Sequence, residues 1–106
     1  MNERIERTIL RNLFRNEEYF RKVLPFIKGD YYAEPEEKVV YEEIRQFADK
    51  YDRLPTTEVV LIEVEKRDDV SDQTYSEVRR IIKSFSDVEE DPTKEWLVDA
   101  TEKWCK

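Results

Sequence analysis

Apolar side chains recur at helical spacing most clearly in one stretch near the middle of this chain. They stand at positions i, i+4, i+7, i+8 and i+11, as Val40, Ile44, Phe47, Ala48 and Tyr51. This spacing places them in a single stripe along an α-helix. Pro35 suits the first position of a helix and Pro55 ends the pattern, which predicts a helix over 35–51. We expect this stripe, Phe47 included, to face the core, and Glu43 and the other charged residues off the stripe to be solvated.

Similar patterns precede and follow the central stretch. They predict helices over 3–15, 17–24, 58–66, 72–85 and 92–106. Residues 58–66 are rich in β-branched side chains, but no second strand-like run could pair with them, so we expect a helix there too. The sequence therefore predicts an all-α fold in one domain, 1–106, built as a compact bundle of about six helices.

The composition describes a globular protein with few groups suited to catalysis. Of 106 residues, 39% are apolar and 12% aromatic, too many for a disordered chain, although 42% are charged. A single glycine, Gly29, excludes a P-loop and a dinucleotide-binding glycine fingerprint. Because histidine is absent and Cys105 is the one cysteine, the usual general base, most zinc sites and an internal disulfide are excluded as well. We expect no catalysis, no cofactor and no metal.

Charge is distributed unevenly along the chain. Residues 1–28 carry seven Lys or Arg and four Glu, a net charge of +3, whereas residues 29–106 carry −10. The total of −7 argues against nucleic acid as the main partner. Basic residues gather on one face of the first predicted helix: Arg4, Arg7, Arg11 and Arg15. This face is either solvated, with Glu3 paired to Arg7, or a strip that docks a partner or faces DNA.

Two tryptophans mark the last predicted helix. Trp96 and Trp104 stand eight positions apart, on one side, with Leu97 beside them. The helical pattern is not interrupted before Lys106, so we expect the helix to continue. Trp96 is expected to pack against the helical body. Trp104, with Cys105 and Leu97 as neighbours, is expected on a surface that a partner covers, the alternative being that Trp104 folds back onto its own core.

Several short segments occur in an order typical of one protein family. They are 5–10, 16–23, Asp30-Tyr31-Tyr32, 40–44, Leu54-Pro55-Thr56, 96–98 and 101–104. In this order they resemble the N-terminal domain of DnaB-type hexameric replicative helicases, most closely the version in tailed-phage primase–helicase systems. Two features depart from the family. Arg11-Asn12 stand where bacterial members often have small residues, and the second hairpin helix, the linker and the ATPase domain do not occur in this sequence.

The resemblance implies an accessory role in DNA replication. In this family the N-terminal domains form a collar on the helicase ring, often a trimer of dimers built by helical hairpins, and they help to dock primase. ATP hydrolysis and unwinding belong to the C-terminal domain. Residues 92–106 would be the truncated start of the hairpin, so this chain is expected to be a monomer or a weak dimer. Its partners would be primase and neighbouring helicase subunits, with at most indirect contact with DNA.

The residues expected to bind these partners are contact residues rather than catalytic ones. They are Leu97, Trp104, Cys105, Arg4, Arg7, Arg11 and Arg15. No apolar run approaches the ~18 residues of a membrane span, so we expect a soluble protein of the cytoplasm, that of a bacterial host if the gene is phage-borne.

Two other functions stay open at this point. One is the helicase-binding domain of a primase, which has a similar helical fold. The other is a small DNA-binding or regulatory protein that uses the arginine strip. An enzyme that uses its carboxylates is disfavoured because no nucleophile or metal-ligand constellation accompanies them.

Overall fold

Helices account for all the regular structure in residues 4–105, the part of the chain that this computed structural model describes. In chain order they are α1 (Ile5–Arg15), α2 (Glu17–Val23), the 3-10 turns η1 (Leu24–Phe26) and η2 (Gly29–Tyr31), α3 (Pro35–Tyr51), α4 (Thr57–Glu65), α5 (Asp72–Phe85) and α6 (Lys94–Trp104). The all-α prediction is confirmed, and the β-branched segment forms helix α4 as expected.

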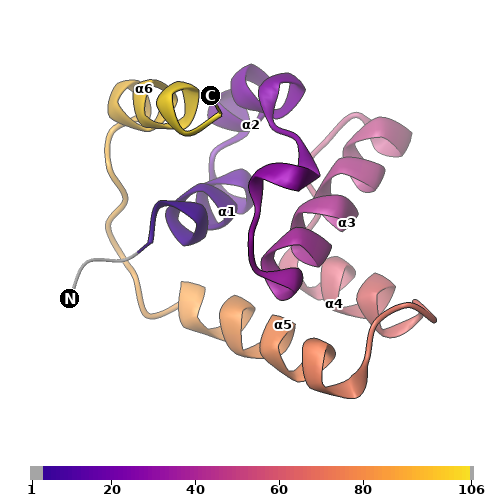
Figure 1. Cartoon of the computed structure of the whole chain (residues 1–106). Coiled ribbons are helices and arrows are strands. Elements are labelled where there is room, and N and C mark those ends of the chain that lie inside the picture. Colours follow the sequence, from indigo (N-terminus) through magenta and orange to yellow (C-terminus); the bar gives the residue numbers. More distant parts are fainter. Residues whose placement is uncertain (1–3, 106) are drawn as a thin grey trace.

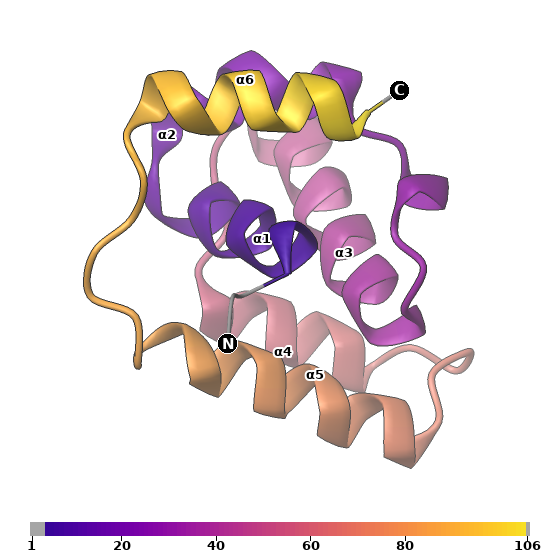
Figure 2. The ribbon, with the colours of Figure 1, turned by 60° about the vertical axis from the view of Figure 1, so that its left-hand side comes forward.

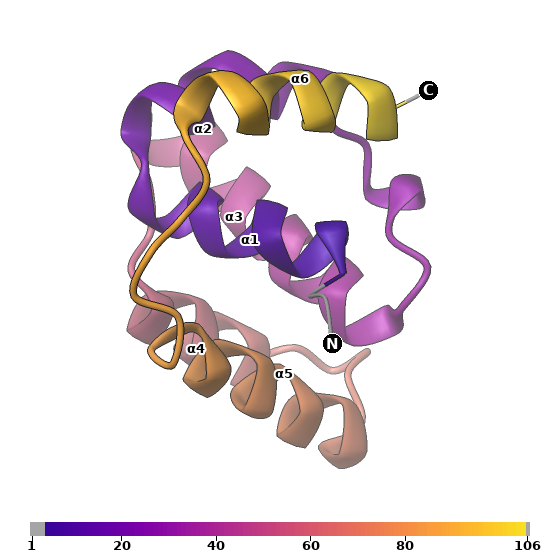
Figure 3. The same ribbon diagram turned by 90° about the vertical axis from the view of Figure 1, so that its left-hand side faces the viewer.

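The six α-helices lie in three layers (Figures 1 and 2). Helices α2 and α6 form the upper layer, α1 and α3 the middle layer, and α4 and α5 the lower layer. Helix α3 contacts α1, α4, α5 and η2, so it is covered from several sides, as the width of its apolar face predicts. The loop from α5 to α6 runs from the lower layer to the upper one beside α1 (Figures 2 and 3).

Polar side chains set where four of the helices begin. The side-chain oxygens of Asn16, Thr56, Ser71 and Thr93 each accept the backbone N–H three residues later, at the starts of α2, α4, α5 and α6. Such caps satisfy N–H groups that the helix itself leaves unpaired. Thr93 therefore starts α6 at Lys94, two residues later than the start predicted at Pro92.

The buried face of α3 differs from the predicted stripe. Val40 and Ile44 are fully buried, as expected, but Phe47 is only half-buried and Tyr51 is 52% exposed. The buried stripe instead begins with Glu37 and includes Tyr41, at i, i+3, i+4 and i+7. A search for apolar residues alone misses this stripe because Glu37 and Tyr41 are polar. Phe47 lies at the edge of the buried stripe.

Glu43 is also buried rather than solvated. It is 6% exposed, and Arg67 Nη1 lies 3.0 Å from its Oε2. Arg67, in the turn after α4, also pairs with Glu42 at 3.1 Å and Asp69 at 2.7 Å. Burial raises the pKa of Glu43 although the hydrogen bond from Arg67 acts in the opposite direction. The expectation that Glu43 is solvated was wrong because its partner lies far along the chain and reaches it only in the folded state.

The exposures on α3 and α4 yield a stability prediction. Ile44→Ala should lower the free energy of unfolding by about 2–5 kcal/mol, because it leaves a cavity in a fully buried site. Ile62→Ala is the matched control: Ile62 is 46% exposed on α4, so the same truncation should change stability by less than about 0.5 kcal/mol. Urea denaturation followed by circular dichroism measures both. Equal losses would show that the buried face of α3 is assigned incorrectly.

Candidate interaction surfaces

The arginine row of α1 consists of Arg4, Arg7, Arg11 and Arg15. One buried carboxylate pairs with its first two members. Glu37, on α3, is fully buried. Arg7 Nε lies 2.9 Å from its Oε2, and Arg4 Nη2 lies 3.1 Å from its Oε1. Burial raises the pKa of Glu37, while the hydrogen bond from Arg7 and the charge of Arg4 act in the opposite direction. This cluster joins α1 to the first turn of α3.

The C-terminal half of the row is held by Asp91, in the loop between α5 and α6. Arg11 Nε lies 2.7 Å from one carboxylate oxygen of Asp91, and Arg15 Nη1 lies 3.0 Å from the other. Arg15 also donates to the backbone carbonyl of Val88 at 2.8 Å and to that of Phe85, at the end of α5. Burial disfavours the charge on Asp91, but the hydrogen bonds from Arg11 and Arg15 outweigh it and lower the pKa of that carboxyl. The loop is thereby fixed against α1.

The solvated-face prediction for the arginines is wrong at Arg11, which is only 2% exposed. Glu3, the expected partner of Arg7, lies outside the described residues. All four guanidinium groups are engaged within the chain: those of Arg4, Arg7, Arg11 and Arg15. Their proposed role in partner binding stays a prediction, but the structure does not present them as an open basic strip.

Leu97 is not at a partner surface: it is fully buried in the core. Thr101, one turn later, is 1% exposed, and its hydroxyl lies 2.6 Å from the hydroxyl of Tyr19 on α2 and donates to the carbonyl of Leu97 at 2.6 Å. Burial raises the pKa of Tyr19 to about 12, so this phenol stays neutral. Leu97 was assigned to the wrong surface because the buried face of α6 also includes Thr101. Thr101 is polar, so a search for apolar residues at helical spacing does not detect this face.

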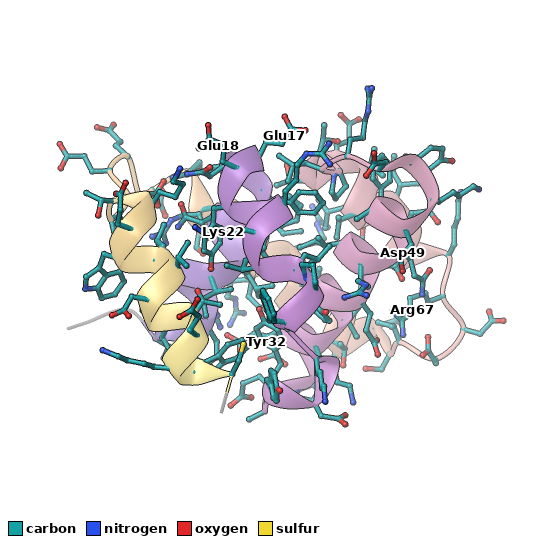
Figure 4. The ribbon with its side chains drawn as sticks, turned by 90° about the horizontal axis from the view of Figure 1, so that it is seen from above. Glu17, Glu18, Lys22, Tyr32, Asp49 and Arg67 are labelled. Atoms are coloured by element: carbon teal, nitrogen blue, oxygen red, sulfur yellow. The ribbon has the colours of Figure 1, made fainter. Side chains whose placement is uncertain are left out.

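Trp104 lies against an aromatic cluster of its own chain. Its ring centroid is 4.9 Å from that of Tyr32 and 5.7 Å from that of Tyr31, and Tyr32 packs on Tyr41 at 5.4 Å. Figure 4 shows Tyr32 beside the C-terminal end of α6. Trp104 and Cys105 are both half-buried, and burial raises the pKa of the Cys105 thiol, so the thiol is protonated at neutral pH. Much of the surface assigned to a partner here is therefore covered by the chain itself.

Trp96 has the opposite outcome from the one predicted. It is 53% exposed, although it was expected to pack on the helical body. The reason is angular: at about 100° per residue, Trp104 lies within about 20° of the buried Leu97, whereas Trp96 lies about 100° away from it. The relevant signal was the spacing of seven from Leu97 to Trp104, rather than the spacing of eight between the tryptophans.

Three other large apolar side chains are exposed among the described residues, including Tyr51, which the sequence predicted to face the core. They are Phe26, Tyr51 and Ile62. The Tyr51 and Phe47 rings pack together with their centroids 4.6 Å apart and their planes tilted by 44°, at a groove of about 360 Å³ between α3 and α4. Pro55 and Val59 form part of the opposite wall. A contiguous exposed apolar patch marks a contact surface, whereas apolar side chains exposed singly are normal.

The described residues hold neither a cluster of metal-ligating side chains nor a helix able to cross a membrane. Residues 4–105 contain no group of three or more Cys, Asp or Glu placed to hold a metal ion. Within the same residues, no helix combines the length and apolar character that a bilayer crossing requires.

Comparison with known proteins supports the coarser part of the resemblance seen in the sequence, the likeness to a replicative helicase. The chain is 28% identical, over 98 residues, to a DnaB-like replicative helicase of Enterobacteria phage T4. The chain is similar to a replicative helicase. The match covers 92% of this chain but 20% of the relative, so the chain spans about a fifth of the relative's length. No family model matches the sequence, and no solved structure matches it.

This similarity supports a link to the replicative helicases, and it extends through most of the helical bundle. The N-terminal position in such a helicase, the collar role and the docking of primase stay predictions. The exposed side chains limit the surfaces through which the chain could bind primase or neighbouring subunits. Trp96 is exposed on α6, about 100° around the helix from the buried Leu97, and a second apolar surface lies at the α3–α4 groove.

The Asp91 site provides a prediction about stability and its pH dependence. Asp91→Asn should lower the free energy of unfolding at pH 7 by about 3 kcal/mol, because the buried charge of Arg11 loses its counter-ion. Asp87→Asn, in the same loop, should have little effect because Asp87 is exposed.

The pH dependence follows from the lowered pKa of Asp91. A carboxyl whose folded pKa lies below its unfolded value of about 3.8 stabilises the fold above that value, and this stabilisation disappears as the pH falls through the folded pKa. The difference between wild type and Asp91→Asn should therefore shrink between about pH 5 and about pH 2. Urea denaturation across this range measures it, and a difference that does not depend on pH would contradict the ion-pair account.

Proposed function

We propose that this chain is a protein-interaction and ring-assembly module of a replicative DNA helicase, equivalent to the collar domain that docks primase, with no catalysis of its own. The observation that carries the proposal is the similarity to a DnaB-like replicative helicase along 92% of the chain. The all-α bundle and the absence of histidine agree with a binding role.

The contact surface proposed for this role is the exposed part of α6 that includes Trp96. Helix α6 packs on α2 through Leu97 and Thr101, which leaves Trp96 exposed on another side of the helix. Exposed tryptophans are enriched among the residues that contribute most to protein–protein binding. In this proposal α6 is the first helix of the collar hairpin, and Trp96 contacts primase or a neighbouring subunit.

A binding measurement with purified proteins tests this role. The probes are the primase and the replicative helicase encoded by the same genome, each titrated against the chain by biolayer interferometry. We expect one or both to bind, and Trp96→Ala to weaken binding by about tenfold or more. Ile62→Ala is the control, since it removes an exposed apolar side chain from a different helix and should leave the affinity unchanged. Absence of binding to both proteins would overturn the proposal.

The proposed module makes no direct contact with DNA. Its net charge is −7, and the four arginines of α1 are engaged by Glu37 and Asp91. We therefore expect no measurable binding to a single-stranded oligonucleotide at about 0.15 M salt in a fluorescence anisotropy titration. Affinity that falls steeply with increasing salt would instead favour a DNA-binding protein.

A further inference from the structure

Helix α5 presents a row of basic side chains to solvent. It forms the lower edge of the molecule in Figures 1 and 2, and it packs on α1, α3 and α4. Its buried residues are Val78, Ile81, Ile82 and Phe85. Arg79, Arg80 and Lys83 are exposed. At about 100° per residue these three cations lie within about 100° of one another, on the side of α5 that faces away from the buried residues.

The cations line a shallow depression of about 610 Å³ on this side of α5. Ser76, Ser84 and Asp87 complete the lining, so every lining residue among those described is polar or charged. We call the depression with its three cations the basic face of α5. It suits a polar or charged ligand, because an apolar group placed there would take these side chains out of water without offering them a partner.

Two of the three cations lack a counter-ion among the described residues. Arg79 and Lys83 form no ion pair there, although Asp87 lines the same depression. Arg80 Nη1 lies 3.3 Å from Glu77 Oε1, but 76% of the Arg80 side chain is exposed, so water screens this pair. Arg79 and Lys83 also stand four residues apart on one helix, where like charges destabilise each other slightly. An anion bound from outside would remove this repulsion.

The spacing of the cations indicates the form of this anion. Arg79 and Lys83 are one helical turn apart, a rise of about 6 Å. In an extended peptide, side chains at alternate positions lie on one side, about 6.8 Å apart. Carboxylates at alternate positions of an extended segment would therefore meet Arg79 and Lys83 in turn, and Arg80 lines the same depression.

Acidic residues at both ends of the basic face favour a short peptide segment over nucleic acid. Asp72, at the start of α5, and Asp87, just after its end, are both exposed. A nucleic-acid strand carries a phosphate at every nucleotide, so a strand lying along α5 would bring phosphates against these carboxylates. A segment with a few carboxylates ends before it reaches them, because the three cations span only about 6 Å of the helix.

We propose that the basic face of α5 binds an extended acidic segment of a partner protein, whose carboxylates at alternate positions pair with Arg79 and Lys83, with Arg80 beside them. The contact consists of exposed charge pairs, so it is weak by itself and weakens further with salt. The basic face belongs to the lower layer and Trp96 to α6 in the upper layer, so one molecule has room for a partner at each. This inference does not depend on the similarity to helicases.

Titration of the whole chain with a fluorescein-labelled peptide in which glutamate alternates with serine tests the proposal. Fluorescence anisotropy at about 0.05 M salt should give a Kd of about 1 mM or tighter. In a proton–nitrogen correlation spectrum, the peptide should shift the backbone amide signals of residues 76–87 and leave the others in place. Arg79→Gln/Lys83→Gln should weaken binding by about tenfold, because two charge pairs are lost. The same peptide with glutamine in place of glutamate should not bind.

Lys22→Gln/Arg53→Gln is the matched control. It removes the same charge from two exposed side chains that form no ion pair with a described residue, and it should leave the affinity within about twofold of the wild type. Trp96→Ala should also leave this affinity unchanged, which separates the basic face from the α6 surface. Circular dichroism verifies that each variant is folded.

Four results would each overturn the proposal. They are no binding of the peptide up to about 1 mM, equal losses of affinity in the two double variants, equal binding of the glutamine peptide, and tighter binding of a single-stranded oligonucleotide with the same number of charges. The last result would assign the basic face to nucleic acid.

Discussion

The architecture depends on two carboxylates, Glu37 and Asp91, that neutralise the row of arginines along α1. Glu37 is fully buried and belongs to α3, whereas Asp91 belongs to the loop that leads to α6. Moving such charges out of water is unfavourable unless each one meets a partner in good geometry. Helix α1 can therefore occupy the middle layer in one position, the one in which both carboxylates reach their arginines. The ion pairs act mainly by selecting this arrangement, because the apolar core supplies most of the stability.

The position of α6 follows from this arrangement. Arg11 and Arg15 fix Asp91, the loop brings the chain up beside α1, and α6 then packs across α2 with Leu97 inward. Seven residues after Leu97, Trp104 falls on the same side and joins the tyrosines of the η2 turn. Trp96 is consequently the exposed tryptophan. The side of α6 that is available to a partner is thus decided by contacts made at the other end of the loop.

The exposed apolar groups lie in several regions of the surface. Trp96 on α6 is proposed to meet primase or a helicase subunit. Phe26 and the α3–α4 groove are separate apolar regions of the surface. The arginine row, which the sequence offered as a docking or DNA-facing strip, is paired with Glu37 and Asp91 and so joins α1 to α3 and to the loop before α6. An acidic surface suits a module that assembles beside other proteins.

Local signals in the sequence determined the helices, because capping residues, proline and helical periodicity act over a few neighbouring positions. They located α3, identified α4 as a helix in spite of its β-branched residues, and indicated the order that resembles the helicase domain. Tertiary structure alone decided which faces are buried and which surfaces are available. Glu43 meets Arg67, Tyr19 meets Thr101 and Arg11 meets Asp91 over separations of 24, 82 and 80 residues. Polar groups buried through such distant partners have no local pattern, so the burial of Leu97 and of Arg11 could not be predicted from the sequence, whereas the helices could.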